Sequence, residues 1–109
     1  MKPAVFLGDS LRRLRAFPES IRWELGHQLE RVQQGREPRD CKPMTSVGHG
    51  VREIRVRDDF GAFRLIYVAS FADAVYVLHT FQKTSQRTSS KDILLAEARF
   101  RTLKRSLGR

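Results

Sequence analysis

Cysteine is almost absent from this chain of 109 residues, which contains only Cys41. One cysteine cannot form an internal disulfide or the cysteine cluster of a structural zinc site. No stretch approaches the roughly 20 apolar residues that a membrane-spanning helix needs. The N-terminus, Met1-Lys2-Pro3, also lacks the apolar run of a signal peptide. We therefore expect one cytoplasmic domain, residues 1–109, that is large enough to form a core without disulfides.

Acidic residues are also scarce. The chain has 12 Asp and Glu against 21 Lys and Arg, which gives a net charge of +9 at pH 7. In so small a domain this excess favours a polyanionic partner, most often nucleic acid. A basic surface that docks an acidic protein, or that only aids solubility, is the alternative. The basic residues lie within predicted strands as well as in the chain ends, and this distribution favours nucleic acid.

Residues 51–83 predict three antiparallel strands joined by two tight turns. Residues 51–57 alternate between apolar and charged side chains, which is typical of a half-buried strand. Residues 62–70 are almost continuously apolar, with Arg64 as the single charge, and residues 75–81 are rich in β-formers. Gly61, in the first turn, can adopt a positive φ. The sequence therefore predicts a meander that carries arginines where Thr or Val would be more usual.

The segments before and after the meander predict three helices. Asp9 or Ser10 is expected to cap the first, Pro18 to begin the second and Gly35 to end it. These two helices would form a hairpin with apolar faces on the sheet. Ser89 or Ser90 would cap the last helix, whose apolar stripe is Ile93, Ala96, Phe100, Leu103 and Leu107.

The remaining segments complete the predicted fold. Residues 4–7 predict a strand at the sheet edge, and residues 36–50 predict a loop with an extended segment at 44–47. The expected class is therefore α+β: a small, twisted, mainly antiparallel sheet packed against an N-terminal helical hairpin, with a C-terminal helix.

The sequence offers no metal or cofactor motif. His27, His49 and His79 fall in different predicted elements, and no P-loop, dinucleotide fingerprint or Ser-His-Asp pattern is present. We therefore expect no cofactor. Trp23 is predicted to lie in the core or at its boundary, and His27 in solvent. Alternation places His79 on the face of Val75, either buried or, if that face is open, free to exchange protons near neutral pH.

Basic side chains on a sheet can support cleavage of RNA without a metal. The 2′-hydroxyl attacks the adjacent phosphate, cations stabilise the charge on the phosphoryl oxygens, and a donor protonates the leaving 5′-oxygen. Arg55, Arg64, Lys83 and His79 could supply these parts, because adjacent antiparallel strands bring them near one another. Arginines on an exposed sheet face are alternatively solvated, or paired with carboxylates such as Glu53.

Several segments together resemble a known family. They are FLGDSLRRLRAFPESIRWELGHQL, KPM, VREIRV and FRLIYVASFADAVYVLHTFQK, and they span the chain from Phe6 to about Leu103. In this order they closely resemble the phage-related branch of the RelE/ParE/HigB toxin superfamily, the toxins of type II toxin–antitoxin modules. The resemblance implies a RelE-like α+β fold and an mRNA interferase, a metal-independent endoribonuclease that often acts in the ribosomal A site.

The resemblance also implies roles for particular residues. Arg55 and Arg64 would hold and neutralise the scissile phosphate, and Lys83 would add charge or donate a proton. Relatives commonly carry a second lysine directly after this one, where the present chain has Thr84. Charge and position alone add four peripheral RNA contacts: Lys42, Arg57, Arg87 and Lys91.

The resemblance implies partners as well. A helix-turn-helix antitoxin of the HigA kind would cover the basic site and bind operator DNA, and mRNA on the ribosome would be the target. Two alternatives remain open: a ParE-like inhibitor of DNA gyrase, and a non-catalytic nucleic-acid-binding module. The basic strand residues favour the endoribonuclease over the gyrase inhibitor, whereas Thr84 keeps the non-catalytic module open.

Overall fold

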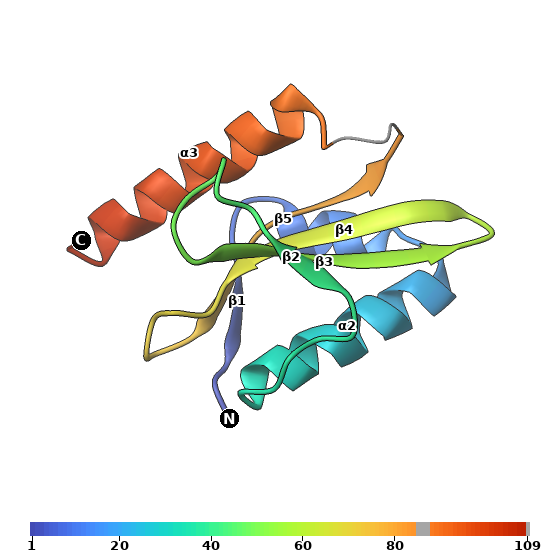
Figure 1. Ribbon diagram of the computed structural model, residues 1–109, viewed down its shortest axis with the longest axis horizontal. Helices are drawn as coiled ribbons and strands as arrows, with labels where there is room; N and C mark the ends of the chain where they lie inside the picture. Colours follow the sequence, from blue (N-terminus) through green and yellow to red (C-terminus); the bar gives the residue numbers. More distant parts are fainter. Residues whose placement is uncertain (85–87, 109) are drawn as a thin grey trace.

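The computed structural model describes residues 1–84 and 88–108, in which five strands form one mixed sheet of order β1-β5-β4-β3-β2 (Figure 1). The strands are β1 (Ala4–Phe6), β2 (Cys41–Pro43), β3 (Val51–Asp58), β4 (Gly61–Val68) and β5 (Val75–Lys83). The helices are α1 (Ser10–Arg15), α2 (Glu19–Gln33) and α3 (Ser90–Ser106). β1 pairs in parallel with β5, and every other pair is antiparallel. The predicted α+β class is confirmed.

The meander forms as the period-2 pattern predicts. β3 and β4 pair from Val51 with Val68 to Asp58 with Gly61, and Arg55 lies directly opposite Arg64. Gly61 adopts a φ of +124° at the turn. The hairpin therefore sets two arginines side by side on adjacent strands.

A β-bulge changes the pattern in β5. Ile66 pairs with His79, but the next residue, Tyr67, pairs with Val77, so Leu78 is an extra residue in β5. An extra residue reverses the alternation of side chains beyond it. Val77 packs in the cluster beneath α1 and α2, whereas His79 bonds to α3 on the other face. The prediction that His79 shares a face with the valines before it is therefore wrong.

Two apolar clusters cover the two faces of the sheet, with α2 on one side and α3 on the other (Figure 1). The first joins the hairpin α1–α2 to the sheet and includes Leu14, Ile21, Leu25, Leu29, Ile54, Leu65 and Tyr67. The second lies beneath α3 and includes Ala96, Phe100, Leu103, Ile66, Val68 and Leu78. The predicted helix stripes thus form the core. No helix within residues 1–84 and 88–108 combines the length and apolar character needed to cross a membrane.

Local details at helix and strand ends differ from expectation. Asp9 makes no capping bond in α1, because its carboxylate binds Arg13 and Arg99 instead. Pro18 is the residue before α2 rather than its first residue, whereas Ser89 caps α3 as predicted.

The extended segment of the 36–50 loop also lies elsewhere. β2 contains Cys41–Pro43, so the strand expected at residues 44–47 occurs three positions earlier. Met44 ends this pairing and starts a turn: its N–H donates to Val51 O at 2.8 Å, and its own carbonyl accepts from Val47 N at 2.9 Å.

Candidate nucleic-acid interface

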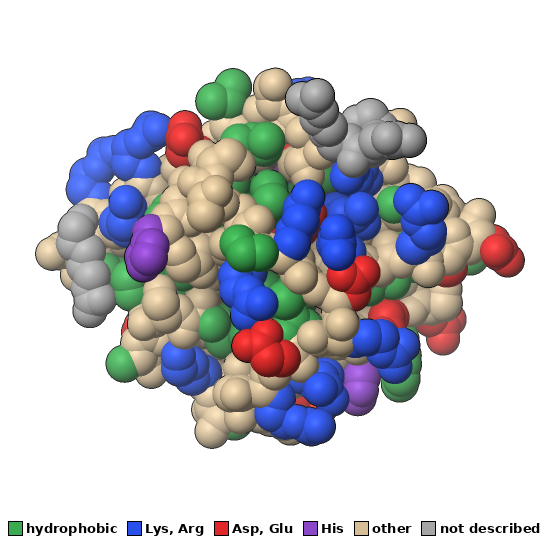
Figure 2. All heavy atoms as spheres, viewed as in Figure 1, with side chains coloured by type: hydrophobic (Ala, Val, Ile, Leu, Met, Phe, Trp, Pro, Cys, Tyr) green, Lys and Arg blue, Asp and Glu red, His purple; other side chains and the backbone are tan. Residues whose placement is uncertain are grey.

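Five basic side chains share the face of the sheet that α3 covers in part. Cross-strand pairing aligns Arg55 with Arg64, Arg57 with Ala62, and Ala62 with Lys83, while Lys42 on β2 lies opposite Glu53 on β3. We call Lys42, Arg55, Arg57, Arg64 and Lys83 the basic face. Figure 2 shows Lys and Arg side chains gathered over the part of the sheet that α3 leaves open.

A carboxylate lies buried within the basic face. Glu53 has no exposed surface, and Thr88 Oγ1 donates a hydrogen bond of 3.0 Å to its Oε2. Its Oε1 lies 3.4 Å from Arg64 Nε and 3.9 Å from Lys42 Nζ. These distances are ion-pair contacts, because neither Oε1 nor Arg64 Nε has an aligned hydrogen bond within the described chain. Glu53 is therefore a counter-ion that two cations share.

Arg64 is the most buried of the five cations. It is 7% exposed, and its Nη1 donates to Phe63 O at 3.1 Å. Burial lowers the pKa of Arg64, the Glu53 charge opposes that shift, and the cations Arg55 and Arg57 add to it. A positive charge held this far from water interacts strongly with an anion that reaches it. A phosphate oxygen is the kind of anion that a guanidinium binds.

Lys83 lies at the end of β5, next to this guanidinium. Burial lowers the pKa of Lys83, and the positive charge of Arg64 lowers it further. A lysine with a lowered pKa gives up a proton more readily than a solvated lysine. The structure therefore brings together a buried guanidinium and an ammonium group with acidic character.

Arg55 and Arg57 lie further out on β3. Arg55 donates from Nε and Nη2 to Asp40 Oδ1, at 3.0 and 2.7 Å, in an exposed contact. Because exposed ion pairs are weak, a phosphate can compete for this guanidinium. Arg57 is exposed. Lys91 is also exposed, in the first turn of α3, and Arg87 lies outside the described residues.

His79 does not share this environment. It is 1% exposed, its Nε2 lies 2.7 Å from Asp92 Oδ1 of α3, and its ring stacks on Phe81. Burial lowers the pKa of His79, with the Asp92 contact opposing that shift. Of the two positions left open by the sequence, the buried one is confirmed. The ring links β5 to the start of α3, and it is not at the surface of the basic face.

Trp23 and His27 lie on the outer side of α2. Trp23 is 66% exposed and stacks on His27, with ring centroids 5.2 Å apart. The prediction of a core or boundary position for Trp23 is wrong, because Ile21 and Leu25 occupy the buried side of the helix. The exposed position of His27 is confirmed.

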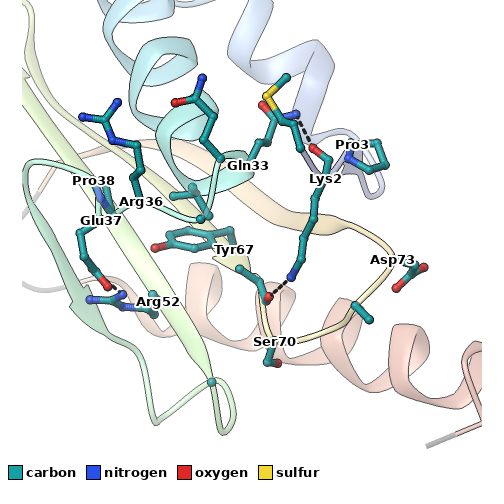
Figure 3. A pocket seen from close by; sticks show the side chains of 17 residues that line it. Lys2, Pro3, Gln33, Arg36, Glu37, Pro38, Arg52, Tyr67, Ser70 and Asp73 are labelled. Carbon is teal, nitrogen blue, oxygen red and sulfur yellow. Dashed lines mark hydrogen bonds and ion pairs between the residues drawn. The ribbon is translucent and has the colours of Figure 1, made fainter.

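The N-terminal segment, the end of α2 and strands β3 and β4 enclose a pocket of about 660 Å³ (Figure 3). Lys2 Nζ donates there to Ala69 O and Phe71 O, and Arg52 pairs with Glu37 at 2.8 Å. Lys2 and Arg52 are thus already bound by groups of the protein. Among the described residues, no three His, Cys, Asp or Glu side chains gather so that they could hold a metal ion.

Glu53 is the residue that sequence reasoning missed as part of the site. The sequence predicts it only as a possible partner of an exposed arginine. The available signal was its position in β3, on the same side of the strand as Arg55 and two residues before it. An acidic side chain on a strand otherwise lined with arginines indicates a counter-ion.

Comparison with known families identifies the family of the chain. Residues 12–101 match the model of the family described as phage-derived protein Gp49-like (DUF891). A comparison with curated proteins found no match. The matched segment runs from α1 through the meander into α3, and so includes the basic face and Glu53. The chain therefore belongs to the Gp49-like family, one of the RelE/HigB-like toxin families.

Proposed function

We propose that this toxin is an endoribonuclease that cleaves mRNA, and that it acts on the ribosome. The observation that carries the proposal is the buried Arg64, surrounded by the other cations of the basic face and backed by Glu53. Most basic surface residues are solvated, whereas this guanidinium is withheld from water in a position that a phosphate can approach. Preorganised charge of this kind stabilises a phosphoryl transition state.

Each side chain has a role in the proposed reaction. The 2′-oxygen forms a bond to phosphorus as the bond to the 5′-oxygen breaks, and the proton of the 2′-hydroxyl passes to water. Arg64 and Arg55 bind the phosphoryl oxygens, where negative charge accumulates. Lys83 donates a proton to the leaving 5′-oxygen, which its lowered pKa favours. Arg57 and Lys42 hold the neighbouring phosphates.

His79 has a positioning role in this scheme. Its bond to Asp92 fixes the first turn of α3 against β5, beside the basic face. The scheme needs no metal, because cationic side chains supply the charge that a metal ion supplies in other nucleases.

An antitoxin partner follows from membership of a toxin family. We propose that it is a helix-turn-helix protein of the HigA kind, that it binds operator DNA, and that it covers the basic face with acidic side chains. The excess of positive charge on that face supports this arrangement, because opposite charges guide such a complex together.

Expression in bacteria tests the proposal. Wild type is expected to arrest growth and to leave cleaved transcripts. Arg64→Ala is expected to do neither, while remaining folded by circular dichroism. Arg22→Ala is the matched control, because Arg22 is an exposed arginine of α2, the helix that packs on the opposite face of the sheet. Full toxicity of a folded Arg64→Ala protein would contradict the proposal. Growth arrest with intact mRNA and DNA damage signalling would indicate gyrase inhibition.

A further inference from the structure

A smaller pocket of about 330 Å³ lies between β2 and the start of α3. Pro43, Met44 and Ile93 provide its apolar walls, and Thr88 and Lys42 lie where it meets the basic face. The chain after β2 runs alongside α3 in Figure 1. The pocket is therefore a hollow at the edge of the proposed site, built from two segments far apart in the sequence.

Two residues connect this pocket to the basic face. Lys42 belongs to both, and its Nζ lies 3.9 Å from Glu53 Oε1. Thr88 lines the pocket and donates its hydroxyl to Glu53 Oε2. Lys42 Nζ and Arg64 Nε are near neighbours, because both contact Glu53 Oε1, at 3.9 and 3.4 Å. A phosphate on Arg64 thus places the base of its own nucleotide, or of the next, within reach of the pocket.

The lining has the chemistry that a nucleobase requires. A thioether, a proline ring and an isoleucine side chain offer apolar contact to a flat ring. Thr45 and Ser46 offer hydroxyl groups to its polar edges. No carboxylate lines the pocket, and Lys42 is its only cation among the described residues. A bare phosphate would find one cation here, whereas an unstacked RNA base finds both kinds of contact.

From these observations we infer that this hollow, the base pocket, binds one unpaired base of the RNA next to the scissile phosphate. The inference rests on the proposed function, since the phosphate on the basic face brings the base to the pocket. Ser46 and Thr45 are then the residues that discriminate between bases, because their exposed hydroxyls can contact the base edge.

Methyl NMR tests the base pocket directly. The protein is labelled at methionine and isoleucine methyl groups and at arginine Nε, then titrated with each ribonucleoside 5′-monophosphate and with ribose 5-phosphate. The nucleotides are expected to shift the methyl signals of Met44 and Ile93, and ribose 5-phosphate is not. Both probes are expected to shift the Nε–H signal of Arg64. Ile21, on the opposite face of the sheet, is the internal control and should not respond.

A second experiment fills the base pocket with a larger side chain. Ser46→Phe places a ring in the pocket from an exposed position, and is expected to weaken nucleotide binding about tenfold, to the level of ribose 5-phosphate. His49→Phe is the matched control, because His49 is exposed in the same loop but does not line the pocket.

The outcomes separate the two claims. If Arg64 responds to both probes while Met44 and Ile93 respond to neither, the base pocket is wrong and the phosphate site stands. If Arg64 responds to neither probe, the proposed function itself loses its support, and the base pocket falls with it.

Discussion

Replacing Glu53 with glutamine tests the electrostatic design of the basic face. Glu53→Gln keeps the size of the side chain and an oxygen that can accept the Thr88 hydrogen bond. It removes only the negative charge. Arg64, 7% exposed, and Lys42 then face each other without their shared counter-ion. The variant is therefore expected to be less stable and to bind anions more tightly.

The burial of Arg64 and of Lys42 determines how much free energy of unfolding the substitution should cost. Breaking a buried ion pair by removing one partner costs about 3–5 kcal/mol. The Lys42 side chain is 41% exposed, so its share is screened to below about 1 kcal/mol. Arg64 keeps its bond to Phe63 O and a small exposed surface, which places the expected loss at or just below the lower end of this range, about 2–3 kcal/mol. For a chain of this size that corresponds to a fall of about 10 °C in Tm.

Urea denaturation and thermal melting measure this loss, with Glu97→Gln as the control. Glu97 pairs with Arg101 at 3.5 Å on the exposed side of α3. Loss of this ion pair should lower the free energy of unfolding by no more than about 0.5 kcal/mol. Added phosphate should stabilise Glu53→Gln more than wild type, and more than chloride at equal ionic strength. A free energy of unfolding of Glu53→Gln within about 0.5 kcal/mol of wild type, with no preference for phosphate over chloride, would show that Glu53 is not the counter-ion of the basic face.

Three further predictions follow from the structure. Gly48→Ala should destabilise the protein by about 1–3 kcal/mol, because its new methyl group meets an aromatic ring of α3, whereas Gly26→Ala, with open space beside it on α2, should stabilise by about 0.5–1 kcal/mol in the same melts. Because burial keeps the pKa of His79 below 6.5, its stabilising contribution is present above that pH and is lost as the pH falls toward the folded pKa. Stability measured against pH should therefore fall less steeply in His79→Gln; an unchanged slope would contradict this. Asp40→Asn frees Arg55 and should tighten RNA binding, while Arg55→Ala should lower the salt dependence of binding by about one ion; equal affinities in filter binding would contradict both.

The sequence predicted the sheet because its local patterns agree with the fold. Period-2 alternation, a positive-φ Gly61 and a run of β-formers each favour the meander that the structure contains. The bulge was not predictable in the same way. Leu78 and His79 both suit a strand, and no glycine or proline marks the extra residue. The extra residue reverses the side chains after it, so that His79 contacts Asp92 of α3.

Trp23 and Asp9 illustrate two different sources of error. Trp23 lies two residues from both Ile21 and Leu25, and at 100° per residue it points away from both, so helix geometry alone contradicts a core position. Asp9, by contrast, is held by Arg99, 90 residues away in the chain. No local pattern could reveal that contact.

Part of the candidate site was accessible from sequence. Antiparallel pairing predicts that Arg55 and Arg64 meet, and the structure places them opposite one another with Lys83 close by. The sharing of Glu53 brings together Arg64 of β4, Lys42 of β2 and Thr88 of the segment before α3. Such contacts join four separate elements, and a pattern within one element cannot specify them.

Cleavage of a defined mRNA by purified protein is the first measurement to make, because it shows whether the basic face is an endoribonuclease site. Wild type, Arg64→Lys and Arg22→Ala are compared on free RNA in EDTA and on programmed ribosomes. Wild type and Arg22→Ala are expected to cleave the RNA, and to cleave it faster on the ribosome. Arg64→Lys is expected to lose most of the cleavage activity, because a lysine cannot offer the same planar fork to a phosphate. If folded wild-type protein leaves the RNA intact in both settings, the basic face is not an endoribonuclease site.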